Sequence, residues 1–144
     1  MKTAYCTLLL LATLVACNQP SKPKTDAPIT QQNDVKIVPI FTFKEVKKQP
    51  DDGLPHVEVS LQLGEKTIRV ADVNACETIQ QENYAQYEIP SEALAACGGW
   101  YAGAGDYFYI TENATHWLVM QGWQDEQQAD KGYHYSQKIS VAKK

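Results

Sequence analysis

Residues 56 to 63 alternate between polar and apolar side chains, and this alternation indicates a β domain. The apolar face would consist of Val57, Val59, Leu61 and Leu63, and the polar face of His56, Glu58, Ser60 and Gln62. A period of two residues is typical of a strand with one buried face. Gly64-Glu65-Lys66 can turn the chain, so Thr67 to Val73 is predicted to pair back as a hairpin.

Further strands are predicted on both sides of this hairpin. Residues Val35 to Phe43 are rich in Val, Ile and Phe but contain Pro39, which favours an edge strand or a bulge. The last third contains three predicted strands, joined by Glu112 to Thr115 and by the polar stretch Gln124 to Gly132; they are Tyr107 to Thr111, His116 to Trp123 and Tyr133 to Val141. In the last of these strands, the alternation predicts one core face formed by Tyr133, Tyr135, Ile139 and Val141.

One short helix is predicted near residues 90 to 97. Pro90 can begin a turn, Ser91 is a suitable N-cap, and Ala93 to Ala96 favour a helix that Gly98-Gly99 would end. The predicted fold class is therefore mainly β: an antiparallel sandwich or a partly closed barrel with one short helix.

The first 17 residues have the layout of a secretion signal. Lys2 precedes a 13-residue apolar run from Ala4 to Ala16, which is shorter than the roughly 20 residues needed to span a bilayer. Leu14-Val15-Ala16-Cys17 resembles the lipobox of bacterial lipoproteins. The resemblance implies cleavage before Cys17 and acylation of that cysteine, and Asn18 after it favours the outer membrane. We therefore expect a periplasm-facing, lipid-anchored protein.

If the first 17 residues are a lipoprotein signal, the chain is expected to divide into three parts. Residues 1–16 would be the signal peptide, and 17–34 the lipidated cysteine with a tether. The tether contains Pro20, Pro23 and Pro28 among polar residues and only one large apolar residue, Ile29, so it is expected to be extended and disordered. Residues 35–144 are of single-domain size.

The charge balance argues against two classes of partner. Loss of Lys2 with the signal would leave 12 basic against 17 acidic residues, a net charge of −5. The chain has no basic cluster, so nucleic-acid binding is disfavoured, as is binding to anionic lipid through a polybasic surface.

The four cysteines are assigned by compartment. Cys6 would leave with the signal and Cys17 would carry lipid, so an even pair remains in an oxidising setting. We predict a disulfide between Cys76 and Cys97, worth about 3 kcal/mol for a loop of about 20 residues. A metal pair or a catalytic thiol are the alternatives, but neither cysteine has a CxxC partner or a nearby histidine, and no metal or cofactor is predicted.

Residues 100 to 135 hold nine of the chain's 14 aromatic residues and surround the glycine-rich segment Gly98 to Asp106. Glycines let a backbone approach a ligand closely, and flat rings supply contact area. Most of these rings are expected to be core, with Trp100, Tyr101 and one of Trp117 or Trp123 exposed. The candidate ligand-binding residues are Trp100, Tyr101, Asp106 and Tyr107.

These observations predict a non-enzymatic envelope module that binds a cell-wall glycan or a protein. An enzyme is disfavoured because the candidate acids, bases and ligands form no recognised catalytic spacing; they are Asp106, His116, Asp125, Glu126, Asp130 and His134. A structural or assembly lipoprotein is the alternative, with a protein partner at the strand edge near Val35 to Phe43.

A third possibility rests on a resemblance of architecture. A lipidated, disulfide-linked, aromatic-rich β domain is similar in outline to the periplasmic lysozyme inhibitors, which push a short loop into the lysozyme cleft. The resemblance implies that Gly103 to Tyr107 is such a loop. The Ser-Gly loop with a following Lys or Arg that is associated with those inhibitors is absent from this sequence.

Overall fold

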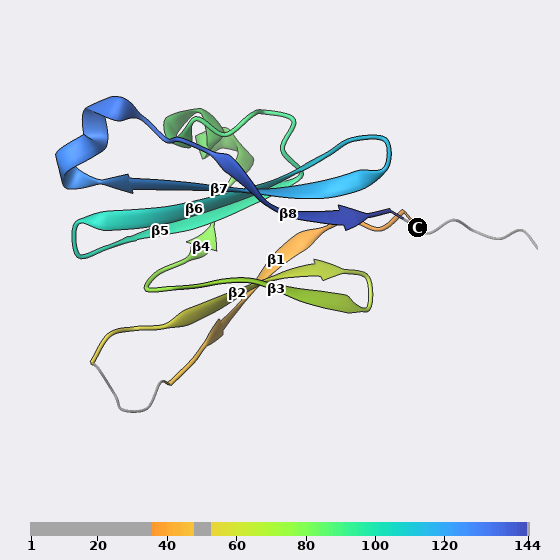
Figure 1. Ribbon diagram of the computed structural model, residues 1–144, viewed down its shortest axis with the longest axis horizontal. Helices are drawn as coiled ribbons and strands as arrows, with labels where there is room; N and C mark the ends of the chain where they lie inside the picture. Colours follow the sequence, from red (N-terminus) through yellow and green to blue (C-terminus); the bar gives the residue numbers. More distant parts are fainter. Residues whose placement is uncertain (1–35, 48–52, 144) are drawn as a thin grey trace, which may run out of the picture. The chain divides into compact units, whose positions relative to one another are not determined.

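The computed structural model describes residues 36–47 and 53–143, which belong to one compact unit from Val35 to Lys144. The predicted signal peptide, Cys17 and the tether lie outside the described residues. Eight strands form two antiparallel sheets that lie face to face as layers (Figure 1). The three-stranded sheet consists of β1 (Ile40–Glu45), β2 (Val57–Leu63) and β3 (Lys66–Val73). The five-stranded sheet consists of β4 (Glu77–Thr78), β5 (Ala95–Tyr101), β6 (Ala104–Glu112), β7 (His116–Asp125) and β8 (Ser136–Ala142).

The described domain is thus the mainly β sandwich that the sequence predicts. Strands that are adjacent in each sheet are also consecutive in the chain, and short turns connect three of the six pairs: β2–β3, β5–β6 and β6–β7. The predicted hairpin is present, because Leu63 pairs with Lys66 across the turn residues Gly64 and Glu65. Strand β1 begins just after Pro39 and lies at the edge of its sheet, as the proline indicates.

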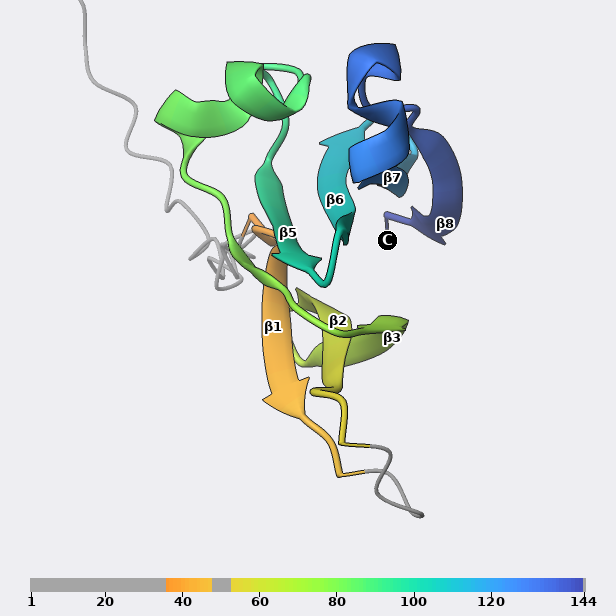
Figure 2. The same ribbon diagram turned by 90° about the vertical axis from the view of Figure 1, so that its left-hand side faces the viewer.

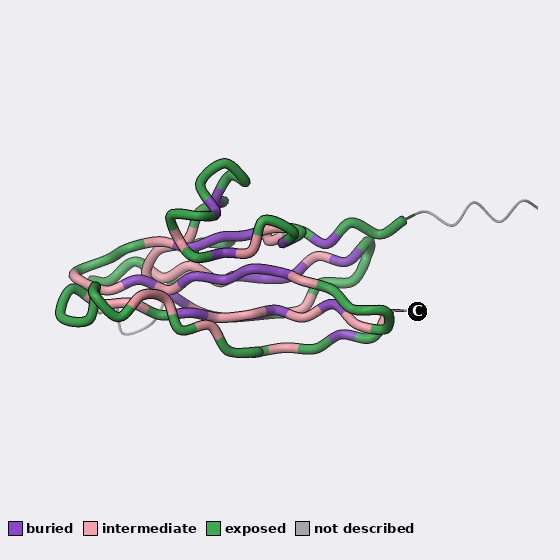
Figure 3. Tube along the Cα trace, turned by 90° about the horizontal axis from the view of Figure 1, so that it is seen from above, coloured by how far each residue is buried: buried purple, intermediate pink, exposed green. Residues whose placement is uncertain are grey.

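The first core lies between the two sheets. The apolar face of β2 contributes Val59 and Leu61, both fully buried, and β6 contributes Phe108 and Ile110 from the opposite sheet. Figure 3 shows these buried segments in the middle of the strands, with exposed residues at the turns. The alternation at residues 56 to 63 therefore gave the correct core face.

A second core covers the other face of the five-stranded sheet. Two 3-10 helices, η1 (Gln81–Tyr87) and η2 (Glu126–Lys131), lie on this side, away from the three-stranded sheet (Figure 2). The buried residues of the second core are Ile79, Tyr84, Ile89, Ala93, Ala96, Tyr107 and Tyr109. The five-stranded sheet is consequently buried on both faces at its centre.

The structure corrects the predicted core face of the last strand. The register of β8 shifts opposite Val119 and Met120, which pair with Ile139 and Gln137, so Lys138 is an extra residue in a β-bulge. A bulge reverses the alternation of side chains. Tyr133 and Tyr135 therefore pack against the second core, whereas Ile139 and Val141 pack in the first.

The predicted helix at residues 90 to 97 is also wrong. Ser91 and Glu92 form a turn and β5 begins at Ala95, while the short helices lie at η1 and, within the stretch predicted as a polar connection, at η2. The Leu94 amide already donates to the carbonyl of Ile110. Ala96 and Cys97 are buried on opposite faces of the sheet, so tertiary packing overrides the helical preference of the alanines.

Glycine next to the tyrosine rings is a packing requirement that can be tested at Gly122. A Cβ atom there would lie 2.7 Å from Cε1 of Tyr135, whose hydroxyl donates to the carbonyl of Tyr87 at 2.8 Å. Gly122→Ala is expected to lower the free energy of unfolding by about 1–3 kcal/mol, the range for overpacking. Urea denaturation measures this, with Ser140→Ala at an exposed β8 position as the control. Equal stability of the two variants would contradict the packing argument.

The tyrosine cluster predicts a loss of stability in alkali. Burial is the main cause that raises the pKa of Tyr84, Tyr107, Tyr109, Tyr133 and Tyr135 above the ordinary value of 10.0. Above a pH of about 10 the unfolded chain loses these protons while the folded chain keeps them, so the free energy of unfolding falls as the pH rises. Tyr107 alone gives a slope of up to about 1.4 kcal/mol per pH unit.

Urea denaturation at a series of pH values from 7 upward measures this slope. Tyr107→Phe should flatten the dependence above pH 10. Tyrosinate absorbance that develops at the ordinary pKa in the folded protein would refute the prediction.

Candidate functional site

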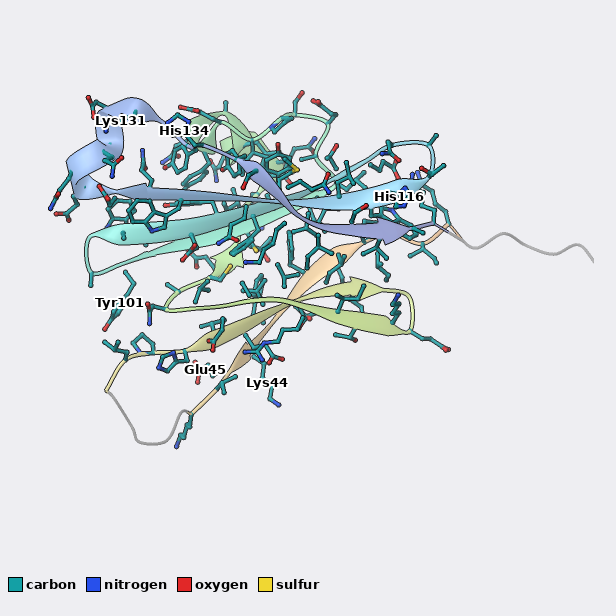
Figure 4. All side chains as sticks on the ribbon, viewed as in Figure 1. Lys44, Glu45, Tyr101, His116, Lys131 and His134 are labelled. Atoms are coloured by element: carbon teal, nitrogen blue, oxygen red, sulfur yellow. The ribbon has the colours of Figure 1, made fainter. Side chains whose placement is uncertain are left out.

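The four residues predicted as one ligand-binding surface lie on two faces of the five-stranded sheet. Trp100 and Tyr101 are consecutive in β5, and Asp106 and Tyr107 are consecutive in β6, so the members of each pair point to opposite sides. Figure 4 places Tyr101 on the side that faces the three-stranded sheet. Asp106 lies on this inner face too, because it pairs with Gly99, two residues before Tyr101.

Tyr107 belongs to the second core rather than to a surface. Its side chain is 5% exposed, and its ring centroid lies 5.2 Å from that of Tyr87 and 4.8 Å from that of Tyr133. Trp100 shares this outer face: a Cβ atom at Gly105 would lie 3.0 Å from its Cε3 atom. Trp100 is 42% exposed, but it is separated from Tyr101 by the sheet itself.

Trp123 completes the inner face beside Asp106. The two residues are directly paired between β6 and β7, and Trp123 is 47% exposed. Trp117, the other tryptophan considered for exposure, is 8% exposed and packs in the first core. Tyr101 on β5 and Trp123 on β7 thus flank the Asp106 carboxylate on β6 from either side.

These residues surround a small hollow of about 110 Å³. The hollow is much smaller than the roughly 300–1,000 Å³ of pockets that enclose whole ligands, so it can hold only one part of a ligand. The Nε2 atom of Gln121 donates to Oδ1 of Asp106 at 3.0 Å, which fixes the carboxylate in place. The residues that line the hollow are Asn74, Ala75, Gly99, Tyr101, Ala104, Gly105, Asp106 and Trp123.

The segment that follows β3 forms one wall of this hollow. The backbone of Ala75 passes so close to Gly99 that a Cβ atom on Gly99 would lie 2.7 Å from the Ala75 carbonyl carbon. Only glycine allows this approach. The Asn74 side chain donates to the carbonyl of Pro55 at 2.9 Å, which ties the same wall to the entry of β2.

Cys76 and Cys97 lie next to each other at the end of this wall. Both are thiols in the structure, and Cys76 packs against the core cluster that contains Cys97. Burial, followed by the neighbouring thiol of Cys76, raises the pKa of Cys97 far above its ordinary value. The disulfide therefore stays a prediction. A disulfide requires two adjacent cysteine side chains, as Cys76 and Cys97 are.

The other residues considered for chemistry are spread over the domain. Figure 4 shows His116 at one end of the sheet and His134 toward the other. The His116 imidazole interacts with the Thr115 hydroxyl at 2.8 Å, next to the turn between β6 and β7. Among residues 36–47 and 53–143, no three His, Cys, Asp or Glu side chains group as metal ligands.

The loop expected from the likeness to lysozyme inhibitors is not formed. Only Ala102 and Gly103 make the turn between β5 and β6, with φ angles of 49° and 89°, and β6 begins at Ala104. Both positive φ values fit a two-residue hairpin whose twist matches the strands. Residues 104 to 107 are therefore paired strand residues, so they cannot extend as a separate loop into a cleft.

Comparison with known protein families, curated proteins and solved structures finds no match for this chain. In the part of the chain that the structure describes, no helix has the length and apolar character to cross a membrane.

The Cys76–Cys97 pair gives a testable prediction for the site wall. Oxidised protein is expected to contain the disulfide, and its reduction should lower the free energy of unfolding by about 3 kcal/mol. Peptide mapping by mass spectrometry identifies the bond, and urea denaturation with and without a reductant measures the effect. Cys76→Ser is the control and should not respond to the reductant. A wild-type protein with the same stability in both conditions would contradict the prediction.

Proposed function

We propose that the domain is a non-enzymatic binding module for a glycan of the bacterial cell envelope, held there by lipid on Cys17. Its binding residues would be Tyr101, Asp106 and Trp123. The location that the signal sequence indicates, at the outer membrane and facing the periplasm, would bring the cell-wall polymer within reach of the tethered domain. A lipid anchor on Cys17 would make the membrane its other partner.

The observation that carries this proposal is the arrangement of two exposed rings around one carboxylate. Tyr101 and Trp123 are 37% and 47% exposed, although large aromatic side chains usually find cover in a domain that buries both faces of a sheet. Three small residues, Gly99, Ala104 and Gly105, also line the hollow between these rings.

The chemistry of this arrangement suits a sugar. A pyranose ring has apolar C–H faces, which pack on flat aromatic rings, and hydroxyl groups at its rim, which donate to a carboxylate. Asp106 keeps acceptor capacity for such hydroxyls, because only its Oδ1 atom accepts a hydrogen bond from Gln121. A hollow that holds one part of a ligand also fits a long polymer that lies across the surface.

Binding is favoured over hydrolysis by the number of carboxylates. Glycoside hydrolases generally use two carboxyl groups that face each other across the scissile bond. Asp106 is the one acidic residue among those that line the hollow in the described part of the chain. It has no second carboxyl group there to complete such a pair.

A structural or assembly role is the second candidate, and the edge of the three-stranded sheet supports it. Among the described strands β1 pairs only with β2, and Ile40 and Phe43 on it are 48% and 37% exposed. An edge strand with exposed apolar residues is suited to pairing with another protein. Recovery of a stoichiometric envelope complex that depends on residues 40–45, without any glycan binding, would favour this role.

The glycan proposal predicts different effects for two tryptophans on opposite faces of the sheet. Trp123→Ala should weaken binding of peptidoglycan glycan fragments about tenfold, because it removes one of the two rings. Trp100→Ala is the matched control: it removes a similarly exposed tryptophan from the outer face and should change the affinity by less than about twofold. Isothermal titration calorimetry measures both, and circular dichroism checks the fold. Equal losses in the two variants, or no binding by the wild type, would refute the proposal.

A further inference from the structure

We infer a second subsite beside Trp123 that takes a negatively charged group of the ligand, so that the preferred ligand is a saccharide carrying a carboxylate. This inference rests on the proposed function and extends it. The first hollow, at Tyr101 and Asp106, would hold a neutral sugar unit. The second would hold the anionic unit that follows it along the polymer.

Trp123 is the residue that connects the two hollows. It lines the hollow with Asp106 and also a second one of about 190 Å³. Strand β8 pairs with β7 only as far as Gln121, opposite Ser136, so the edge of β7 from Gly122 to Asp125 has no strand beside it in the described residues. The residues of η2 and the segment after it lie beside this part of β7 instead, and with Trp123 they line the second hollow.

The lining of the second hollow has the chemistry of an anion site. The residues are Trp123, Gln124, Gln128, Lys131, Gly132 and His134. They include one ammonium group, one imidazole and two amides, and none carries a carboxylate, although the chain as a whole has a net charge of −4. Figure 4 shows Lys131 and His134 close together on the outer side of the sheet, opposite to Tyr101.

Lys131 and Gln124 in this hollow donate to neutral partners. Nζ of Lys131 donates to Oε1 of Gln128 at 3.4 Å, and Nε2 of Gln124 donates to the carbonyl of Ala129 at 3.3 Å. Lys131 therefore has no ion pair among the described residues, and a ligand carboxylate would supply its counter-charge.

Two carboxylates near the hollow have hydrogen-bond partners other than Lys131. Oε2 of Glu88, which packs against Gly132, accepts the backbone N–H of Tyr133 at 3.3 Å. Oδ2 of Asp125 accepts from Nε2 of Gln128 at 3.3 Å. Neither acid forms an ion pair with Lys131 among the described residues.

The test compares two tetrasaccharides that differ in charge. One is the neutral tetramer of N-acetylglucosamine, and the other alternates N-acetylglucosamine with N-acetylmuramic acid, whose lactyl groups carry carboxylates. The wild-type protein should bind the acidic tetramer about fivefold more tightly in calorimetry at low salt, and added salt should reduce this preference. Trp123→Ala should weaken binding of both tetramers because Trp123 borders both hollows.

Charge variants separate the subsite from a general effect of charge. Lys131→Gln should remove most of the preference for the acidic tetramer, with an effect of about fivefold, and leave the neutral tetramer unaffected. Lys131→Arg keeps the charge and should keep the preference. Lys44→Gln removes an exposed lysine of β1 that lines neither hollow, and it should change neither affinity.

The possible failures are distinguishable. If the wild type binds both tetramers equally and Trp123→Ala weakens both, the proposed function stands and the anionic subsite is refuted. The subsite is also refuted if Lys131→Gln and Lys44→Gln have the same effect. If neither tetramer binds, the proposed function fails, and the subsite fails with it.

Discussion

Burial of the five-stranded sheet on both of its faces is the constraint on which the domain depends. Tyr107 and Phe108 are consecutive in β6, yet both are buried, because the three-stranded sheet covers one face and the short helices with their tyrosines cover the other. The bulge at Lys138 lets the segment from Tyr133 to Val141 contribute to both cores, since it turns the side chains before and after it to different sides. Tyr101 and Trp123 are partly exposed on the inner face, where the cover by the three-stranded sheet is incomplete.

The glycines between residues 98 and 106 are required by contacts within the protein and not by a ligand. Read alone, Gly98 to Asp106 suggests a loop that lets the backbone approach a ligand. In the structure the close approach at Gly98 is made by the protein's own Tyr107 ring, and the one at Gly99 by the backbone of Ala75. Glycine meets the same steric need in either case. Whether a ligand atom or a protein atom packs on a glycine depends on tertiary contacts. The sequence of one segment does not reveal these contacts.

The strands with one buried face could be predicted because their period of two reports burial directly, as in β2. The prediction of a helix at residues 90 to 97 was wrong because β5 is buried on both faces and therefore lacks the alternation of a strand. The predicted face of Tyr133 was wrong because the bulge at Lys138 shifts the alternation. The same limit applies to the site. Trp117 and Trp123 are six residues apart in one strand, so alternation places them on the same side. Only the cover of the three-stranded sheet makes one 8% and the other 47% exposed.

The start of the described domain and the candidate site lie at opposite ends of β6. The charge of Lys36, the first described residue, acts on the carboxylate of Glu112, so the chain enters the domain at the end of β6 that leads into the β6–β7 turn. Tyr101 and Ala104 lie at the opposite end, and the nine residues of β6 separate these ends by about 26 Å. A lipid anchor that precedes Lys36 would thus be joined to the end of the domain remote from the hollows.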